Sequence, residues 1–182
     1  MPEKIFEKIA QELKKGVFTE GHYFKYFTLA TLGVDQFARL RLVALRNVSE
    51  DLKLTFFTDK RSKKMLHIKE NNRVSLLFYD HKKLIQLRIE GIAGINNDQF
   101  QIQKSWEQVG VEARKDYITK EAPGSTIGDP GSLEYLREGD YFSIVEIDPF
   151  RIEYLELKKN RHTKIRYSKE GNGDWTSEYL VP

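Results

Sequence analysis

The sequence predicts a mainly β protein with a few helices, in which an antiparallel sheet closes or nearly closes into a barrel. Many short stretches alternate apolar and polar residues and are rich in Val, Ile, Phe, Tyr and Thr, a pattern typical of half-buried strands. Most of these stretches are joined by short connections, which favours antiparallel neighbours over βαβ units. A barrel suits so many strands because closure removes exposed edges. The 182 residues contain no internal repeat and no low-complexity linker, so we expect one domain, residues 1–182, with a single core.

The chain begins with an amphipathic segment. Apolar residues recur at helical spacing from Ile5 to Leu13, and Gly16 follows them. This spacing predicts a helix over residues 3–15 that ends at Gly16 and packs its apolar face on the barrel.

The strands and the remaining helices follow from hydrophobic periodicity and turn residues. Asn172 and Gly173 lie between two alternating runs, which indicates a β-hairpin. The one long irregular stretch runs from Thr119 to Ser132, a length that in a compact domain usually indicates function or mobility. We expect strands near 24–32, 37–46, 52–58, 74–80, 83–95, 141–148, 151–157, 163–168 and 174–180, and helices at about 62–70, 98–109 and 112–118.

Composition excludes several kinds of chemistry. The chain has no cysteine, which rules out disulfides, thiolate nucleophiles and zinc–sulfur or iron–sulfur sites. Its four histidines show no HxxxH spacing, so we expect no metal site. The N-terminus lacks an apolar signal region, and no apolar run approaches the roughly 20 residues of a membrane span, so we expect a cytosolic protein without membrane contact. The net charge of +3 is too small to predict nucleic acid as the main partner.

Some short motifs lack the context that their chemistry needs. GSTIG, residues 124–128, has its serine one place too early for a nucleophile elbow. GNGDWT, residues 171–176, lacks the final glycine of a dinucleotide fingerprint and lies in the expected hairpin. A P-loop is absent. The sequence therefore does not predict a hydrolase or a dinucleotide-binding fold.

Basic residues cluster where the helix at 62–70 is expected to begin. The stretch FFTDKRSKKMLHIKEN, residues 56–71, contains Lys60, Arg61, Lys63 and Lys64. A helix N-terminus already carries positive partial charge and unpaired N–H groups, so basic side chains there repel one another. One interpretation is a solvated cluster whose aliphatic stems cover apolar surface. The other is a phosphate site, with Ser62 as N-cap and the basic side chains around the anion.

Two predicted strands also place polar side chains on one face. Arg41 shares a face of strand 37–46 with Arg39, and Gln86 lies on the polar face of strand 83–95. Each face could be merely solvated, or it could line a site. Strand parity places Arg46 opposite to Arg41 unless the strand ends or bulges there.

Several segments together resemble a known family. In order, they are RLVALRN at 41–47, FFTDKRSKK at 56–64, NNRVSLLFYD at 71–80, IQLRIEG at 85–91, and Tyr117 followed by GSTIG at 124–128. They resemble the pyridoxamine 5'-phosphate oxidases and their FMN-binding split-barrel relatives over most of residues 25–130. The resemblance implies an antiparallel Greek-key split barrel with peripheral helices. It also implies a homodimer that binds two FMN molecules in clefts between its subunits.

The resemblance further implies which residues hold the cofactor. Arg41, Ser62, Lys63 and Lys64 are expected to hold the FMN phosphate. The backbone near residues 43–45 and Thr58 are expected to line the flavin, and Gln86 to bond the isoalloxazine edge. The full predicted set is Arg41, Leu42, Val43, Ala44, Leu45, Arg46, Phe57, Thr58, Ser62, Lys63, Lys64 and Gln86.

The substrate side departs from the family pattern. By position, the residues that resemble substrate-contacting residues of the true oxidases are Arg46, Tyr117, Ser125 and His162. Two arginines of the pattern fall on Glu121 and Asn160 in this sequence. An acid near a substrate phosphate lowers affinity, so we expect a substrate other than pyridoxine phosphate.

These observations predict an FMN-dependent oxidoreductase whose substrate and electron donor the residue types do not identify, and to which we assign no catalytic side chain. Two alternatives stay open. One is pyridoxamine or pyridoxine 5'-phosphate oxidase itself, and the other is a non-catalytic FMN-binding or sensing module. An OB-like barrel that binds nucleic acid is disfavoured because the aromatic residues fall at core-like positions.

Overall fold

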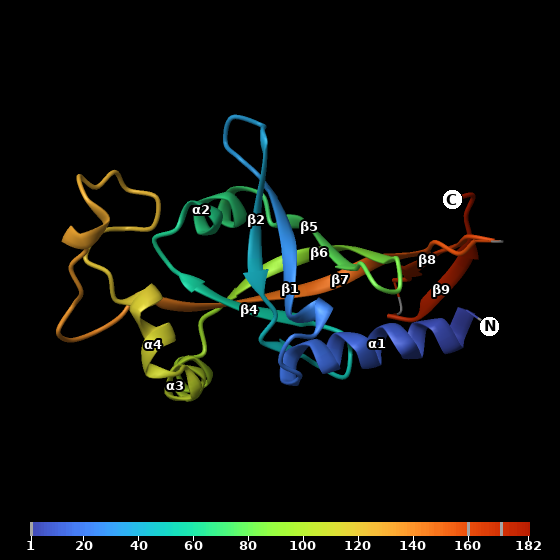
Figure 1. The fold of residues 1–182 in the computed structure, drawn as a ribbon, viewed down its shortest axis with the longest axis horizontal. Helices are drawn as coiled ribbons and strands as arrows, with labels where there is room; N and C mark the ends of the chain where they lie inside the picture. Colours follow the sequence, from blue (N-terminus) through green and yellow to red (C-terminus); the bar gives the residue numbers. More distant parts are fainter. Residues whose placement is uncertain (1, 160, 172) are drawn as a thin grey trace.

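One curled antiparallel sheet organises the protein (Figure 1). The computed structural model describes residues 2–159, 161–171 and 173–182. The described strands are β1 (Tyr26–Leu32), β2 (Ala38–Ala44), β3 (Asn47–Val48), β4 (Leu54–Asp59), β5 (Arg73–Asp80), β6 (Ile85–Asn96), β7 (Phe142–Glu156), β8 (Thr163–Lys169) and β9 (Trp175–Tyr179). They follow the order β2-β1-β5-β6-β7-β4-β3, and β8 and β9 extend the sheet from β7. The predicted antiparallel β architecture is confirmed.

The sheet curls because its two ends belong to neighbouring parts of the chain. β3 follows β2 directly in sequence but lies at the other end of the strand order, paired with β4. Between them, the backbone N–H of Arg46 donates to the carbonyl of Thr55 at 2.8 Å. The enclosed space is filled by side chains from the inner strand faces, among them the fully buried Phe27, Phe56, Phe78, Leu87 and Ile147. A half-barrel with a packed interior results.

The helices lie at the periphery of the sheet. They are α1 (Pro2–Phe18), α2 (Lys63–Glu70), α3 (Gln99–Gln108) and α4 (Val111–Arg114). Short 3-10 turns cover Tyr23–Lys25, Lys115–Tyr117 and Pro130–Ser132. In Figure 1, α1 runs along one side of the sheet, whereas α3 and α4 lie at the end opposite β8 and β9. Within the described residues, no helix combines the length and the apolarity that crossing a membrane requires.

The predicted end of the first helix is wrong, because Gly16 is a packing residue and not a terminator. α1 continues through Gly16 to Phe18. A Cβ atom at this position would lie 2.6 Å from the carbonyl oxygen of Phe24, so only glycine lets the helix approach the 3-10 turn so closely. The buried side chains of Ile9 and Leu13 join the main core, as the amphipathic pattern predicted.

The two strands predicted at 141–148 and 151–157 are one strand, β7. Pro149 suggests a break, but it pairs with Gly91 at the point where the β6–β7 register shifts after Glu90. A bulge of this kind accommodates a residue that lacks an N–H donor without ending the strand. Two other differences are small: β3 was not predicted, and the strand predicted from residue 24 begins at Tyr26 after a 3-10 turn.

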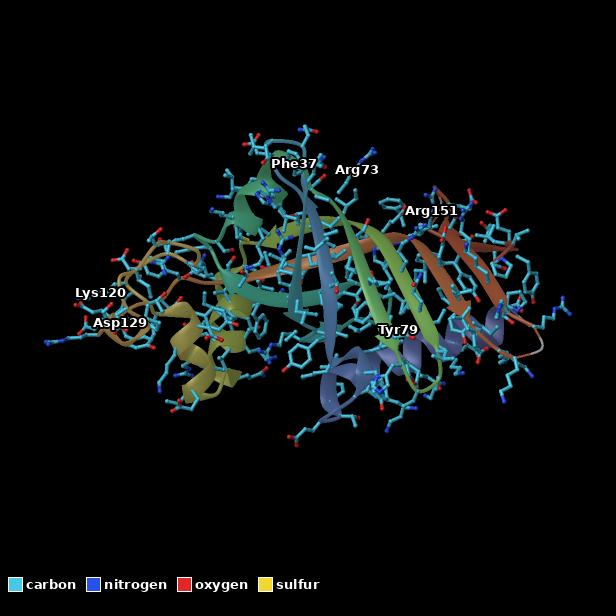
Figure 2. The ribbon with its side chains drawn as sticks, turned by 45° about the horizontal axis from the view of Figure 1, so that its top comes forward. Phe37, Arg73, Tyr79, Lys120, Asp129 and Arg151 are labelled. Carbon is cyan, nitrogen blue, oxygen red and sulfur yellow. The ribbon has the colours of Figure 1, made fainter. Side chains whose placement is uncertain are left out.

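The predicted C-terminal hairpin and the long irregular segment are both present. β8 and β9 pair around a turn in which Glu170 and Asp174 are hydrogen bonded, and Gly173 has a φ of +92°. Asn172, the other predicted turn residue, lies outside the described residues. Residues 119–132 are mostly exposed, and Figure 2 shows Lys120 and Asp129 in this loop at one end of the molecule.

Candidate functional site

The basic cluster at the start of α2 divides into paired and unpaired cations. Arg61 is paired, because its guanidinium bonds both carboxylate oxygens of the buried Asp59, at 2.6 Å in the closest contact. It also donates to the carbonyls of Thr119 and Lys120 at 2.8 Å and lies over the ring of Tyr141. Arg61 therefore holds the long loop against β4. Its positive charge is neutralised by Asp59 and does not favour a bound anion.

Lys64 is the cation that the helix turns toward the interior. Its ammonium donates to the hydroxyl oxygens of Thr58 at 2.9 Å and Ser62 at 3.3 Å. Burial of the ammonium, together with the nearby positive charge of Arg41, lowers the pKa of Lys64, and Asp59 only partly opposes this effect. Because Asp59 is bound to Arg61, Lys64 is in no ion pair within the described part of the chain.

Ser62 is the N-cap of α2, as predicted, and its backbone is extended. Its buried hydroxyl makes no capping bond to the helix and instead lies 3.2 Å from the hydroxyl of Thr58. The helix N-terminus therefore presents hydroxyl groups and unpaired N–H groups beside the Lys64 ammonium.

Arg41 comes from the inward-facing side of β2. Its guanidinium donates to the hydroxyl of Thr31 at 2.7 Å and to the carbonyl of Leu29 at 3.3 Å, both on β1. No carboxylate pairs with it among the described residues. Burial and the charge of Arg39 lower the pKa of Arg41, which nevertheless stays charged at neutral pH because a guanidinium is a very weak acid. Arg41 and Lys64 thus form a partly buried pair of like charges.

A cavity of about 470 Å³ opens beside Lys64. It joins the two halves of the predicted site, because Phe57, Thr58 and Lys64 line one side and Tyr117 and Ser125 line the other. Asp116 and Glu121 bring acidic groups to the same wall. The structure therefore brings predicted cofactor residues and predicted substrate residues to one place.

Arg46 reaches this region because β2 ends at Ala44. Strand parity had placed Arg46 opposite to Arg41 unless the strand ended there. Its guanidinium lies 5.6 Å from the centre of the Phe57 ring. Burial raises the pKa of the Tyr117 hydroxyl, and Arg46, which is hydrogen bonded to it, acts in the opposite direction. Arg46 thus lies beside both Phe57 and Tyr117, which line the cavity.

Other predicted residues lie elsewhere in the single chain. Leu42 and Gln86 are exposed on the outer face of the sheet, whereas Val43 and Leu45 are buried in the core. Ala44 is half-buried and Lys63 is exposed. His162 lines a different cavity, of about 790 Å³, formed with the C-terminal residues of the chain. Asn160 lies outside the described residues.

Sequence reasoning missed Thr31 and His67. The two side chains are buried, and the Thr31 hydroxyl lies 3.0 Å from Nδ1 of His67 while it also binds Arg41. A signal for Thr31 was present, because it follows Phe27 and Leu29 on the inward-facing positions of its strand, where a polar residue needs a partner. His67 had no comparable signal, since its partner is 36 positions away.

These residues fit a phosphate group. Two cations that form no ion pair with the described residues, two hydroxyls and the N-terminus of an eight-residue helix converge, and each is a group that binds phosphate oxygens. An anion here would offset the repulsion between Arg41 and Lys64. The fold is an antiparallel split barrel, and the start of α2 presents groups of the kind that bind a phosphate.

Comparison with known proteins identifies the family of this chain. The family model for the pyridoxamine 5'-phosphate oxidase, FMN-binding domain, matches residues 4–97. The chain is 31% identical over 170 residues to the pyridoxine/pyridoxamine 5'-phosphate oxidase of Psychrobacter cryohalolentis, covering 85% of this chain and 78% of that protein. It is 25% identical over 194 residues to the enzyme of the same name from Pelagibacter ubique, covering 100% and 91%. The chain belongs to the pyridoxamine 5'-phosphate oxidase FMN-binding domain family.

Solved structures show the same fold. A pyridoxamine 5'-phosphate oxidase-related, FMN-binding protein from Nostoc punctiforme has a TM-score of 0.78 at 22% identity, with 97% of this chain and 96% of that chain covered. PhzG from Burkholderia lata, in complex with tetrahydrophenazine-1-carboxylic acid, has a TM-score of 0.79 at 21% identity, with coverage of 100% and 92%. The split-barrel prediction is therefore confirmed.

Proposed function

We propose that this protein binds FMN, with the cofactor phosphate at the start of α2, and that it works as a flavin-dependent oxidoreductase. The observation that carries the proposal is the pair Arg41 and Lys64, partly buried cations whose described hydrogen-bond partners are hydroxyls and a carbonyl. Membership of a family whose domain is FMN-binding supports the same ligand. When bound, the flavin supplies hydride transfer.

The residues near the cavity have distinct roles in this proposal. Lys64, Arg41 and Ser62 hold the phosphate, and the exposed Lys63 screens it from the solvent side. Thr58 orients the Lys64 ammonium through their 2.9 Å hydrogen bond, and Phe57 offers an aromatic wall. The backbone of residues 43–45 would line the flavin. Arg46, Tyr117 and Ser125 face the substrate.

We also propose a homodimer, because the outer face of β2, β1 and β5 is apolar and uncovered. Leu42 is 74% exposed, Leu40 67% and Tyr26 60%, and they lie side by side with Leu77 and Tyr79 through the β1–β2 and β1–β5 pairings. Exposed apolar surface of this kind indicates a protein–protein contact. Gln86 pairs with Tyr79 at the border of this face, so a second copy seated here would bring Gln86 to the subunit interface.

Two observations favour different substrates. Asp116 and Glu121 place negative charge in the cavity, which opposes a second phosphate group and favours a substrate without one. The names of the relatives favour the second candidate, oxidation of pyridoxamine or pyridoxine 5'-phosphate. We propose the substrate without a phosphate group, because Asp116 and Glu121 are residues of this chain, whereas the names describe its relatives.

Cofactor binding is tested by titrating the protein, stripped of any bound flavin, with FMN and with riboflavin, and following flavin fluorescence at low salt. We expect FMN to bind with micromolar affinity or better, and riboflavin, which lacks the phosphate, to bind far more weakly. Equal affinity for both would overturn the phosphate site, and absence of binding would overturn the function.

Catalysis is tested by two assays on the FMN-loaded protein. Stopped-flow mixing with NADH or NADPH is expected to bleach the flavin absorbance, and failure of both donors would favour a non-catalytic flavin-binding module. Hydrogen peroxide release with pyridoxamine 5'-phosphate separates the two oxidoreductase candidates. We expect little release, and rapid release would establish the second candidate.

A further inference from the structure

Arg41 is connected to α2 through a buried chain of three side chains. Its guanidinium donates to the Thr31 hydroxyl at 2.7 Å, and that hydroxyl lies 3.0 Å from Nδ1 of His67 on α2. Thr31 is 3% exposed and His67 is 7% exposed. These hydrogen bonds therefore link α2, the helix of the proposed anion site, through β1 to a cation on β2.

Hydrogen-bond geometry favours one tautomer of His67. A guanidinium has only donors, so the Thr31 oxygen must accept from Arg41. The Thr31 proton is then free to donate, and Nδ1 of His67 is the acceptor that lies within reach. If His67 carried a proton on Nδ1, the buried Thr31 proton would lose this acceptor, which is costly. We therefore assign His67 the neutral tautomer with its ring proton on Nε2, in which Nδ1 accepts the Thr31 proton.

The charges around His67 agree with a neutral ring. Arg39 and Arg41 face it from β2, Asp35 faces it from the β1–β2 turn, and Lys63 lies on its own helix. Burial, followed by the positive charges, lowers the pKa of His67 below its usual 6.5, and Asp35 opposes them. The ring is thus uncharged at neutral pH and can accept the Thr31 proton.

We propose that His67 is a positioning residue, which holds the Arg41 guanidinium through Thr31 in the orientation that receives the cofactor phosphate. This inference rests on the proposed function. Without the His67 acceptor, the Thr31 hydroxyl is free to rotate, and Arg41 loses a fixed partner. The charge of Arg41 stays, but its direction is no longer set.

Two substitutions of His67 test the proposal in FMN titrations at pH 7.5. His67→Leu removes the acceptor and is expected to weaken FMN binding by about three- to tenfold, the scale of one hydrogen bond between neutral groups. His67→Gln offers an amide oxygen in place of Nδ1 and is expected to restore most of that loss. The exposed His81, at the far turn between β5 and β6, provides the matched control His81→Gln, which is expected to bind as the wild type does. Wild-type affinity in His67→Leu would overturn the proposal.

The pH profile separates positioning from simple charge. Between pH 7.5 and 5.5 the phosphate itself takes up a proton, so each profile is compared with that of His67→Gln, which cannot titrate there. If His67 positions Arg41, its protonation breaks the chain, and the wild type loses more affinity on acidification than His67→Gln does. If His67 acted only as a charge, its protonation would attract the phosphate, and the wild type would lose less. That result, or superimposable profiles over the range in which NMR shows the His67 ring to titrate, would contradict the proposal.

NMR of the protein without any flavin separates this inference from the proposed function. The Arg41 side-chain N–H signal is expected to move with pH at the midpoint of the His67 ring, and to stay constant in His67→Gln. An Arg41 signal that ignores His67 while FMN still binds would defeat the positioning role alone. A signal that follows His67 in a protein that binds no FMN would defeat the proposed function and leave the chain of contacts standing.

Discussion

Among the four cations near the start of α2, Lys64 and Arg61 show how local partners decide the role of a charge. Both are basic and three positions apart, yet Asp59 neutralises only Arg61, while Lys64 points to hydroxyls. The folded protein disfavours the charged form of Lys64, as its lowered pKa shows. A dianion beside the ammonium would reverse this cost, so Lys64 gains from a ligand and Arg61 does not.

The substitution Lys64→Ala follows from this difference. A charge-assisted contact contributes about 1.5–3 kcal/mol, so we expect FMN affinity to fall by roughly 10- to 150-fold. Riboflavin affinity is expected to change little, because the lost partner is the phosphate. Fluorescence titration with both flavins measures the two effects.

Lys60→Ala is the matched control at the residue scale. Lys60 lies in the same turn, but its ammonium is exposed and lies 5.5 Å from the Tyr141 ring, away from the Thr58 and Ser62 hydroxyls. Removing it changes the net charge by the same amount, and we expect FMN affinity within about twofold of the wild type. If both variants weaken binding equally, net charge and not the site governs affinity.

At the scale of elements, the N-terminal region of α2 is expected to act as a unit. Lys63→Glu combined with Lys64→Glu places two acids at a helix N-terminus, where the helix dipole accommodates them and the fold survives. The phosphate, however, meets repulsion in place of attraction, and we expect the purified protein to lose bound FMN. Absorbance at the flavin band and circular dichroism measure cofactor and fold separately. Retained yellow colour would refute the assignment of the site to α2.

The contact between α1 and the following 3-10 turn gives a stability prediction. Gly16→Ala introduces a Cβ 2.6 Å from the Phe24 carbonyl oxygen, a backbone atom that cannot move alone. We expect a loss of about 1–3 kcal/mol in the free energy of unfolding, the usual cost of overpacking. Gly110→Ala is the control, because open space surrounds that position and its φ of −60° suits alanine. Urea denaturation compares them, and equal stability of both variants would contradict the packing argument.

Sequence patterns predicted more of the helices and strands than of the contacts within the candidate site. The helix at 62–70 and its Ser62 N-cap followed from local residues alone, and both are present. The continuity of β7 across Pro149 did not follow, because it depends on the register shift between β6 and β7 at Gly91. Arg41 and Lys64 were predicted through the family resemblance, whereas the contact that joins Thr31 to His67 depends on how α2 packs on β1. Contacts between distant segments are the part that local periodicity does not encode.

At the scale of the whole molecule, the predicted residues fall into two groups. Phe57, Lys64 and Tyr117 meet in one cavity, whereas Gln86 and His162 lie outside it in the single chain. The apolar face of β2, β1 and β5, with Phe37 projecting from the tip of the β1–β2 hairpin in Figure 2, is the surface on which a second copy can settle. A dimer is thus the arrangement that gives Gln86 a place in the proposed site.

Leu42→Glu tests this arrangement. Leu42 is 74% exposed on β2, the terminal strand of the uncovered face, and a carboxylate buried there by a second copy without a partner is strongly unfavourable. We expect the variant to sediment as a monomer with an intact fold. Its FMN affinity is expected to fall on the order of tenfold, because binding that depends on the assembled state is lost with it. Sedimentation velocity and fluorescence titration on the same samples measure both effects.

Phe100→Glu provides the control, because Phe100 is 76% exposed, about as much as Leu42, but lies on α3, away from the apolar sheet face. If the sheet face is the interface, this variant stays dimeric and keeps its FMN affinity, since an acid at an exposed helical position remains in water. A wild-type protein that sediments as a monomer while it binds FMN tightly would overturn the dimer. In that case the single cavity beside Lys64 would have to hold the whole cofactor, and Gln86 would have no role in binding it.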